Sequence, residues 1–177
     1  MTVFDGRPLD ETGRTIEEMR VYDALDRLGI GYTRVDHAPA MTMEDCLAVD
    51  EALDIHAPKN LFLRNTQKTE FYLLVMPGDK RFKTKDLSAQ LGIARLSFAE
   101  EAYMYQYLGV HPGSVTIVGL MNDTEKKVHL VVDRDAYKEV YMGCHPCANT
   151  SSIKLKTADM FEKFLPFTGH TPVFVTL

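Results

Sequence analysis

The chain has 177 residues, 45% of them hydrophobic and 25% charged, which is enough for one globular domain with a substantial buried core. Its formal net charge of -5 excludes a broad electrostatic attraction to nucleic acid, although a local basic patch remains compatible with it. No segment resembles a secretory signal and no apolar run reaches membrane-spanning length, so we expect a cytoplasmic protein that does not bind membranes.

The N-terminal part of the chain contains one well-marked helix. Residues 1–14 are polar and rich in turn formers, and we expect them to form a surface lead-in to a single domain over residues 15–177. Thr15 and Glu18 are spaced as in a capping box, in which each side chain binds a free backbone N–H at the start of a helix. Gly29 supplies a conformationally permissive end. The apolar stripe of this helix would consist of Val21, Leu25 and Leu28.

The next segment is expected to hold a strand, a helix and a hairpin. Residues 32–35 are typical of a strand, and Thr42 can cap a helix that runs to about Leu53. Two apolar runs, residues 61–63 and 71–76, are separated by a polar turn and therefore predict two buried strands paired as a hairpin.

Short helices that end at glycine are expected in the middle of the chain. One would run from Thr84 to Gly92, and another from Ser97 to Gly109, the second opened by a capping box between Ser97 and Glu100. The remaining expected strands are residues 115–120, 128–132, 153–155 and 173–175.

The last helix is expected to begin at a Thr157 cap and to end at Pro166, because proline lacks a backbone N–H and disrupts a helix interior. Strands interleaved with helices indicate an α/β or α+β domain with a mixed sheet.

Residues 143–152, Gly-Cys-His-Pro-Cys-Ala-Asn-Thr-Ser-Ser, combine two thiols, an imidazole, an amide and three hydroxyls without a charge. Cys144 and Cys147 have the spacing of zinc ligands with His145 between them, but the third cysteine, Cys46, lies far away without a paired ligand. A redox dithiol is a second interpretation, yet such motifs open a helix whereas this run enters a strand. The odd number of cysteines argues against a disulfide framework.

A third interpretation treats the two thiols as small packing residues, which is what most free buried cysteines are. His145, Asn149 and Thr150 would then be neutral hydrogen-bonding groups that either hold a polar substrate or only satisfy a turn.

Two further segments carry candidate chemistry. Lys59 and Asn60 stand at the mouth of an apolar strand, where the lysine is either solvated or supplies positive charge to a site. Residues 108–115, Leu-Gly-Val-His-Pro-Gly-Ser-Val, place glycines on both sides of a proline. Such a loop is typical of a tight turn, and its backbone N–H groups could also bind a carbonyl or an oxyanion.

Together and in this order, these segments resemble the YbaK-type aminoacyl-tRNA deacylase family, and within it the ProX-like prolyl-tRNA editing proteins. The resemblance covers nearly all of the chain from about Thr15 and includes the opening helix. The matching residues are Lys59-Asn60-Leu61-Phe62-Leu63, Gly109-Val110-His111-Pro112-Gly113-Ser114-Val115, His145-Pro146 and Asn149-Thr150.

The resemblance implies an α/β fold in which a single domain holds a mixed, strongly curved sheet surrounded by helices. It also implies hydrolysis of the aminoacyl ester on mischarged tRNA without a metal or other cofactor, with alanine on proline tRNA as the usual substrate. Cysteine or serine esters and a non-catalytic role inside a synthetase complex are the alternatives, and prolyl-tRNA synthetase is a candidate partner.

The resemblance also implies residue roles. Catalytic roles fall to Lys59, through its positive charge, and to Gly109 and Gly113, through loop N–H groups that hold the ester carbonyl. No strong protein base stands nearby, so the vicinal ribose hydroxyl of the substrate would orient the water. The residues expected to bind substrate are Asn60, Pro112, His145, Asn149 and Thr150.

The sequence further suggests how alanine and proline could be told apart. An added methylene is worth only about 1–3 kcal/mol in a binding site, so we expect a small cavity, bounded by residues 109–113 and His145, that excludes proline by size. His111 and the paired thiols inherit no role from the family.

A tRNA substrate requires local cations in a chain of negative net charge. The densest basic cluster gives four expected phosphate contacts, with a solvated lead-in to a helix as the alternative. They are Lys80, Arg81, Lys83 and Lys85, with Arg64, Lys68 and Arg95 as additional candidates.

Overall fold

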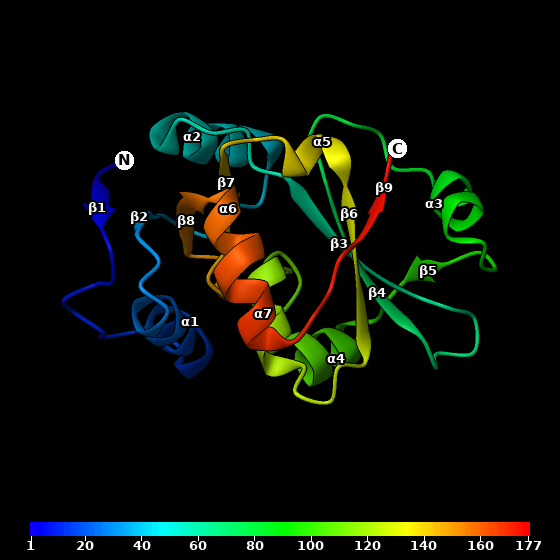
Figure 1. Ribbon diagram of the computed structural model, residues 1–177. Coiled ribbons are helices and arrows are strands. Elements are labelled where there is room, and N and C mark those ends of the chain that lie inside the picture. The colour runs from blue at the N-terminus through cyan, green and yellow to red at the C-terminus, as the bar shows by residue number, and fades with distance from the viewer.

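The computed structural model describes residues 1–177 (Figure 1). Its strands are β1 (Val3–Asp5), β2 (Tyr32–Asp36), β3 (Lys59–Arg64), β4 (Phe71–Met76), β5 (Ser97–Phe98), β6 (Val128–Asp133), β7 (Tyr141–Cys144), β8 (Ser151–Lys156) and β9 (Val173–Val175). Its α-helices are α1 (Ile16–Arg27), α2 (Met43–Leu53), α3 (Thr84–Leu91), α4 (Glu101–Tyr103), α5 (Arg134–Tyr137), α6 (Thr157–Asp159) and α7 (Leu165–Thr168). Two π-helical segments, η1 (Met104–Leu108) and η3 (Met160–Phe164), and one 3₁₀ helix, η2 (Ile117–Asn122), complete the fold.

The strands form two sheets. One is a four-stranded antiparallel sheet in the order β1-β2-β8-β7. The other is a five-stranded mixed sheet in the order β5-β3-β4-β6-β9, in which β3 and β4 form the expected antiparallel hairpin and β6 runs parallel to both β4 and β9. The α/β class with a mixed sheet is therefore confirmed, with the strands divided between two sheets.

Strand β4 shows how the sequence divides the core between the two faces of the mixed sheet. Phe71, Leu73 and Val75 face a cluster of 28 buried residues that is shared with α1 and the antiparallel sheet. Leu74 and Met76 face the opposite way, into a cluster of seven buried residues that includes Leu87 and Leu96 and lies under α3. This alternation follows from the two-residue period of a strand, and it places the larger cluster between the sheets.

The predicted caps at the starts of α1 and α2 are only partly as expected. The Thr42 hydroxyl accepts from the Asp45 N–H, and the Asp45 carboxylate returns to the Thr42 N–H, which completes a capping box. The Thr15 hydroxyl accepts from the Glu18 N–H, as predicted. The Glu18 carboxylate does not return to the cap, because it is buried and bonded to other side chains.

Two predictions in the middle of the chain are wrong. Ser97 does not cap a helix but forms the short strand β5, and the helix begins at Glu101 and ends, after its π-helical turn, at the left-handed Gly109. Residues 115–120 contain no strand, since residues 117–122 form η2. A short run that is buried on all sides has no periodicity that separates a strand from a helix.

The C-terminal helix passes through Pro166 and ends at Gly169. In the preceding π-helical turn, the Leu165 N–H donates to the Met160 carbonyl five residues back. Proline follows directly, at the start of α7, where a missing N–H is tolerated. The predicted stop was wrong because it assumed a regular α-helix up to this point.

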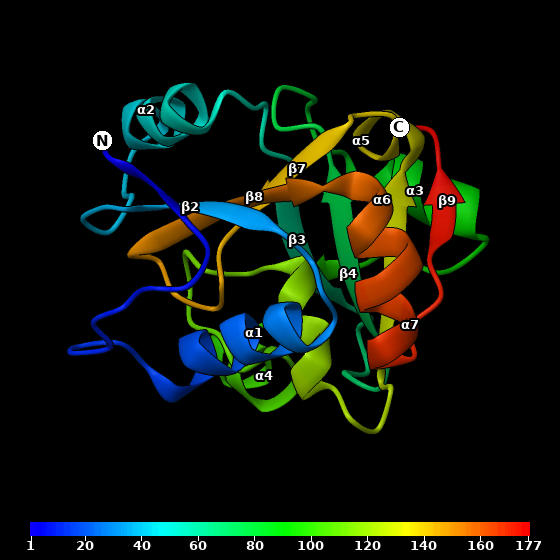
Figure 2. The same ribbon diagram turned by 60° about the vertical axis from the view of Figure 1, so that its left-hand side comes forward.

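Strands β1 and β7 were not predicted from the sequence. Val3–Asp5 pairs with β2, so part of the expected lead-in is an edge strand of the antiparallel sheet. Tyr141–Cys144 pairs with β8, so the thiol-rich run begins inside a strand and turns back into the next one (Figure 2).

Candidate functional site

The glycine-proline loop and the run after β7 lie directly against each other at Gly113 and Asn149. Gly113 has φ +90°, in the left-handed region, and a Cβ at this position would lie 2.9 Å from Asn149 Nδ2. Only glycine meets both constraints without strain or displacement. The structure therefore brings together two of the three segments that the sequence singles out.

The two glycines of the loop differ in what their N–H groups can do. The Gly109 N–H donates to the carbonyls of Met104 and Tyr105, so this residue ends η1 and has no free donor. This corrects the expectation that Gly109 is an oxyanion donor. The Gly113 N–H has no partner within the chain and lies at the exposed tip beside Pro112.

His145 is held by the strand that follows it. Its Nδ1 is 2.9 Å from the Ser151 carbonyl and 3.4 Å from Ser152 Oγ. Its ring meets that of His37 edge to face, with 6.1 Å between the centroids. Burial lowers the pKa of the His145 imidazole, with the nearby His37 acting in the same direction, so the ring is neutral at neutral pH.

Thr150 contributes less than the sequence suggested. It is exposed and its hydroxyl makes no hydrogen bond, while its carbonyl accepts from the His37 N–H at 2.9 Å. The backbone of Thr150 therefore fixes the start of the loop that carries His37.

Lys59 and Asn60 open β3, as predicted, but no hydrogen bond or ion pair joins them to the other two segments. Lys59 Nζ donates to the Lys80 carbonyl and has no carboxylate partner. The chain just before Lys59 does lie beside β7, because a Cβ at Gly143 would meet the side chains of Ile55 and Ala57. Strand β7 then leads into His145.

Two of the predicted residues carry buried oxygen atoms without a partner. Of the five buried side-chain polar atoms left unpaired in the whole chain, two are Asn60 Oδ1 and Asn149 Oδ1. An unpaired buried carbonyl is costly unless a donor from outside the chain satisfies it. These two amide oxygens are therefore the unsatisfied hydrogen-bond acceptors among the predicted site residues.

The thiols of Cys144 and Cys147 belong to the core. Both are free and buried, and both are part of the larger hydrophobic cluster. Burial raises the pKa of Cys144 to about 12 and also raises that of Cys147, which is the opposite of an activated redox thiolate. No group of three or more His, Cys, Asp or Glu side chains in the chain is arranged to hold a metal ion.

Lys80 differs from the rest of the basic cluster. Its ammonium contacts Asp133 at 3.0 Å, Asp135 at 2.7 Å and the carbonyl of Leu177 at 2.9 Å. The charge of Lys80 is therefore neutralised by carboxylates of the protein itself, contrary to the expected phosphate contact. The cluster residues that are exposed and form no ion pair are Arg81, Lys83 and Lys85.

A hollow of about 540 Å³ lies elsewhere on the surface, between α2 and the start of β7. It is lined by Leu47, Asp50, Glu51, Asp54, Ile55, His56, Glu139, Val140 and Tyr141. None of the predicted site residues lines it, so it is not the amino-acid cavity that the sequence led us to expect.

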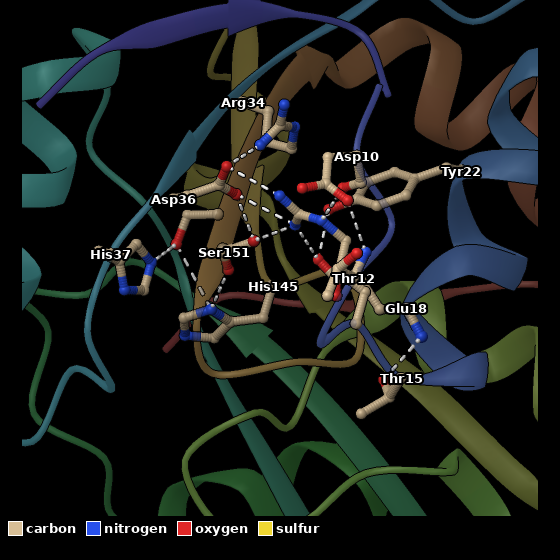
Figure 3. Close-up of polar contacts among 12 residues, drawn as sticks. Asp10, Thr12, Thr15, Glu18, Tyr22, Arg34, Asp36, His37, His145 and Ser151 are labelled. Atoms are coloured by element: carbon tan, nitrogen blue, oxygen red, sulfur yellow. Dashed lines mark hydrogen bonds and ion pairs between the residues drawn. The ribbon is translucent and has the colours of Figure 1, made fainter. Parts of the chain in front are cut away.

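Sequence reasoning missed a charged network beside His145. Figure 3 shows Asp36 and Ser151 between Arg34 on one side and His145 on the other. Ser151 Oγ donates to Asp36 Oδ1 at 2.7 Å, and Arg34 forms an ion pair with the same carboxylate. A charged residue at the end of a strand is ordinarily solvated, so nothing in the sequence marked this network.

No helix of the protein is both long and apolar enough to cross a bilayer.

Comparison with known proteins shows the family to which the chain belongs. The aminoacyl-tRNA editing domain family matches residues 37–163. A prolyl-tRNA editing protein, ProX of Acetoanaerobium sticklandii, is 33% identical over 147 residues, covering 83% of this chain and 89% of its own. Prolyl-tRNA synthetase associated domain-containing protein 1 of Danio rerio is 33% identical over 154 residues, covering 86% of this chain and 83% of its own.

A solved structure of a proposed trans-editing enzyme for prolyl tRNA synthetase has the same fold. It superposes with a TM-score of 0.68 at 18% identity and covers 92% of this chain and 98% of its own. The chain therefore belongs to the aminoacyl-tRNA editing domain family and is an aminoacyl-tRNA deacylase of the ProX-like kind.

Proposed function

We propose that this protein removes alanine from mischarged proline tRNA, acting in trans, in the cytoplasm and without a metal, through a unit spanning residues 15–177. The observation that carries the proposal is the pair of unpartnered buried oxygens, Asn60 Oδ1 and Asn149 Oδ1, on two segments of the site. The α-ammonium of an aminoacyl ester carries N–H donors that could satisfy them. The names of the two relatives support prolyl tRNA as the carrier.

Hydrolysis of the ester needs a donor for the oxyanion that develops on the carbonyl oxygen. Water adds to the carbonyl carbon, and the bond to the ribose oxygen then breaks while that oxygen takes up a proton. The free and exposed Gly113 N–H is the loop donor best suited to the oxyanion. Lys59, which has no carboxylate partner, supplies positive charge toward the ester or the terminal phosphate. The vicinal ribose hydroxyl orients the water.

Discrimination against proline is proposed to be steric. Asn149 packs on Gly113, so the loop and the amide form one continuous wall, next to which we place Pro112, His145 and Thr150. A secondary amine in a ring is bulkier than the alanine methyl and ammonium, and exclusion by volume does not depend on the small free energy of one methylene.

The test is a deacylation panel with proline tRNA charged with alanine, cysteine, serine or proline. We expect rapid loss of alanine and little loss of proline, with or without a chelator. Removing an oxyanion-stabilising group costs on the order of a hundredfold in kcat. We therefore expect the kcat of Lys59→Ala on alanyl-tRNA to be lower than that of the wild type by about this factor. Lys156→Ala removes an exposed lysine on β8 and serves as the matched control.

The panel also separates the alternatives. Faster loss of cysteine or serine than of alanine would reassign the substrate. Tight binding of alanyl-tRNA without any hydrolysis would instead identify a non-catalytic module acting with prolyl-tRNA synthetase. Normal turnover by Lys59→Ala would remove that residue from the mechanism.

A further inference from the structure

We propose that Arg14 is a positioning residue that acts through Asp36 and Ser151 to hold His145 in a single tautomer, with Nε2 free toward the aminoacyl end of the substrate. The inference rests on the proposed function for the role of His145. It adds a part of the chain that the editing-domain match does not include, because Arg14 and Asp36 both lie before residue 37.

The guanidinium of Arg14 joins three elements at one point. Its Nη1 is 2.7 Å from Glu18 Oε1 on α1, and its Nη2 is 2.9 Å from Asp36 Oδ2 at the end of β2. Nη1 also donates to Ser151 Oγ at 3.2 Å, at the start of β8. Glu18 and Ser151 are buried and Arg14 is largely buried, so these contacts form an interior network and not a surface ion pair.

The network sits where the strand pair that carries the site begins. Asp36 and Ser151 face each other in the register of β2 and β8, and His145 and the rest of its loop come immediately before Ser151. The last pair of a ladder frays easily unless side chains hold it. Figure 3 shows Ser151 in contact with both Asp36 and His145. Ser151 therefore belongs both to the Arg14 network and to the candidate site.

The hydrogen bonds around Ser151 and Ser152 fix where each proton lies. The Ser151 carbonyl can only accept, so the His145 Nδ1 atom must carry the proton in the 2.9 Å contact. Ser152 Oγ can then only accept from that Nδ1, and it also lies 2.9 Å from His37 Nε2. His37 Nδ1 in turn donates to the Ala38 carbonyl at 2.8 Å. Both rings therefore carry a proton on Nδ1, and His145, whose pKa is lowered by burial, is a neutral Nδ1–H tautomer.

This arrangement leaves one ring atom of His145 available. His145 Nε2 has no hydrogen-bond partner within the protein. It is not one of the fully buried unpaired atoms, so a ligand can reach it. A neutral imidazole whose Nδ1–H is anchored presents Nε2 as a hydrogen-bond acceptor. A donor on the aminoacyl end, such as the ammonium or a ribose hydroxyl, matches it.

Two variants test whether Arg14 positions His145 through Asp36 and Ser151, and neither removes a charge from the network. Ser151→Ala removes only the hydroxyl between Arg14 and Asp36 and keeps the carbonyl that binds His145. Arg14→Lys keeps the charge but cannot reach two carboxylates and a hydroxyl with a planar fork. Ser88→Ala, a buried serine on α3, and Arg7→Lys, which pairs with Asp23 on the surface, are the matched controls.

The measurements are steady-state deacylation of alanyl-tRNA and the ring ¹⁵N signals of His145, identified by their absence in His145→Gln. We expect kcat to fall about tenfold to a hundredfold in both variants, with a smaller change in KM, because a misplaced group weakens the transition state more than binding. The ¹⁵N signals should move from a single Nδ1–H tautomer to a mixture. Both controls should match the wild type.

Unchanged kcat and an unchanged tautomer in Ser151→Ala would overturn the proposal. If Arg14→Lys melts below the assay temperature, the Ser151→Ala result decides alone, since it deletes no charge. The ¹⁵N readout needs no substrate, so it also separates this proposal from the proposed function. A wild-type protein that hydrolyses none of the charged tRNAs but shows the single His145 tautomer would contradict the proposed deacylation and would still support the positioning of His145.

Discussion

Gly113 carries two constraints that can be separated by experiment. Its backbone is left-handed, at φ +90°, and Asn149 occupies the space where a Cβ would stand. Gly13 is also left-handed, at φ +77°, but no heavy atom lies within 4 Å of its Cβ position. The two glycines therefore form a matched pair that differs in the contact with the site.

Gly113→Ala should lose both stability and activity, whereas Gly13→Ala should lose only stability. The left-handed conformation costs a non-glycine residue about 1–2 kcal/mol, and this applies to both variants. Only Gly113→Ala must push Asn149 aside, and we expect its kcat/KM on alanyl-tRNA to drop by at least about tenfold. Equal activity in the two variants would show that the contact with Asn149 has no part in the site.

A buried hydrogen-bonded pair, Asp123 and His170, lies outside the site and links the end of η2 to the C-terminal segment. His170 Nε2 is 2.8 Å from Asp123 Oδ2, and both side chains are almost fully buried. Burial alone would raise the pKa of the Asp123 carboxyl, but hydrogen bonds from His170 and from two backbone N–H groups lower it below its ordinary value.

The lowered pKa of Asp123 gives this pair a definite pH dependence. A carboxyl with a depressed folded pKa stabilises the protein above its unfolded value of about 3.9, and this stabilisation disappears as the pH falls through the folded value. Asp123→Asn should therefore lower the free energy of unfolding by about 1–3 kcal/mol at pH 7, with the difference from wild type shrinking below about pH 4. Urea unfolding at several pH values measures both, with the exposed Asp79→Asn as control. A difference that stays constant down to pH 3 would contradict the assignment.

Most elements could be predicted because a local signal marked them. Thr42 marks the start of α2, and the continuous apolar run of β4 fits a strand that is buried on both faces. The elements that were missed lack such a signal. The run from Ile117 to Leu120 that begins η2 is fully buried, and the π-helical turn before Pro166 is distinguished only by the backbone hydrogen bond from Leu165 to Met160. The same holds for the site, where motif order indicated Lys59 and Asn149 but no local pattern revealed that Arg14 contacts Ser151.

The loop that leads into α3, together with the first turn of that helix, is the segment proposed to contact tRNA phosphates. Arg81, Lys83 and Lys85 are exposed and free of carboxylates, whereas Lys80 is paired with Asp133 and Asp135. The first three can release counterions from tRNA on binding, which makes affinity depend on salt.

Replacing Arg81, Lys83 and Lys85 by alanine should weaken tRNA binding and flatten its salt dependence. For every phosphate that is no longer neutralised, the slope of log K against log salt becomes shallower by about one. A triple variant that removes the same charge elsewhere, at Arg20, Arg27 and Lys156, should weaken binding less and leave the slope unchanged. Equal slopes for the two triple variants, measured by fluorescence anisotropy, would exclude this loop from the interface.

The candidate site draws its residues from both sheets, so its geometry depends on the whole molecule. Lys59 and Asn60 lie on β3 of the mixed sheet, whereas His145 lies between β7 and β8 of the antiparallel sheet. One cluster of 28 buried residues, which includes Phe62 of one sheet and Leu155 of the other, joins the two. The two halves of the site should therefore stay in place until this cluster melts.

It follows that activity and structure should be lost at the same temperature, and that Leu155→Ala should lower both midpoints equally. This substitution removes a fully buried side chain from the shared cluster, at a cost of about 2–5 kcal/mol. Leu87→Ala empties a similar volume in the seven-residue cluster under α3, on the far face of the mixed sheet. If the chain unfolds as one unit, residual deacylation and far-ultraviolet circular dichroism should shift together in this variant as well. A Leu87→Ala protein that melts earlier by circular dichroism but keeps the wild-type inactivation temperature would show that the α3 face unfolds apart from the site.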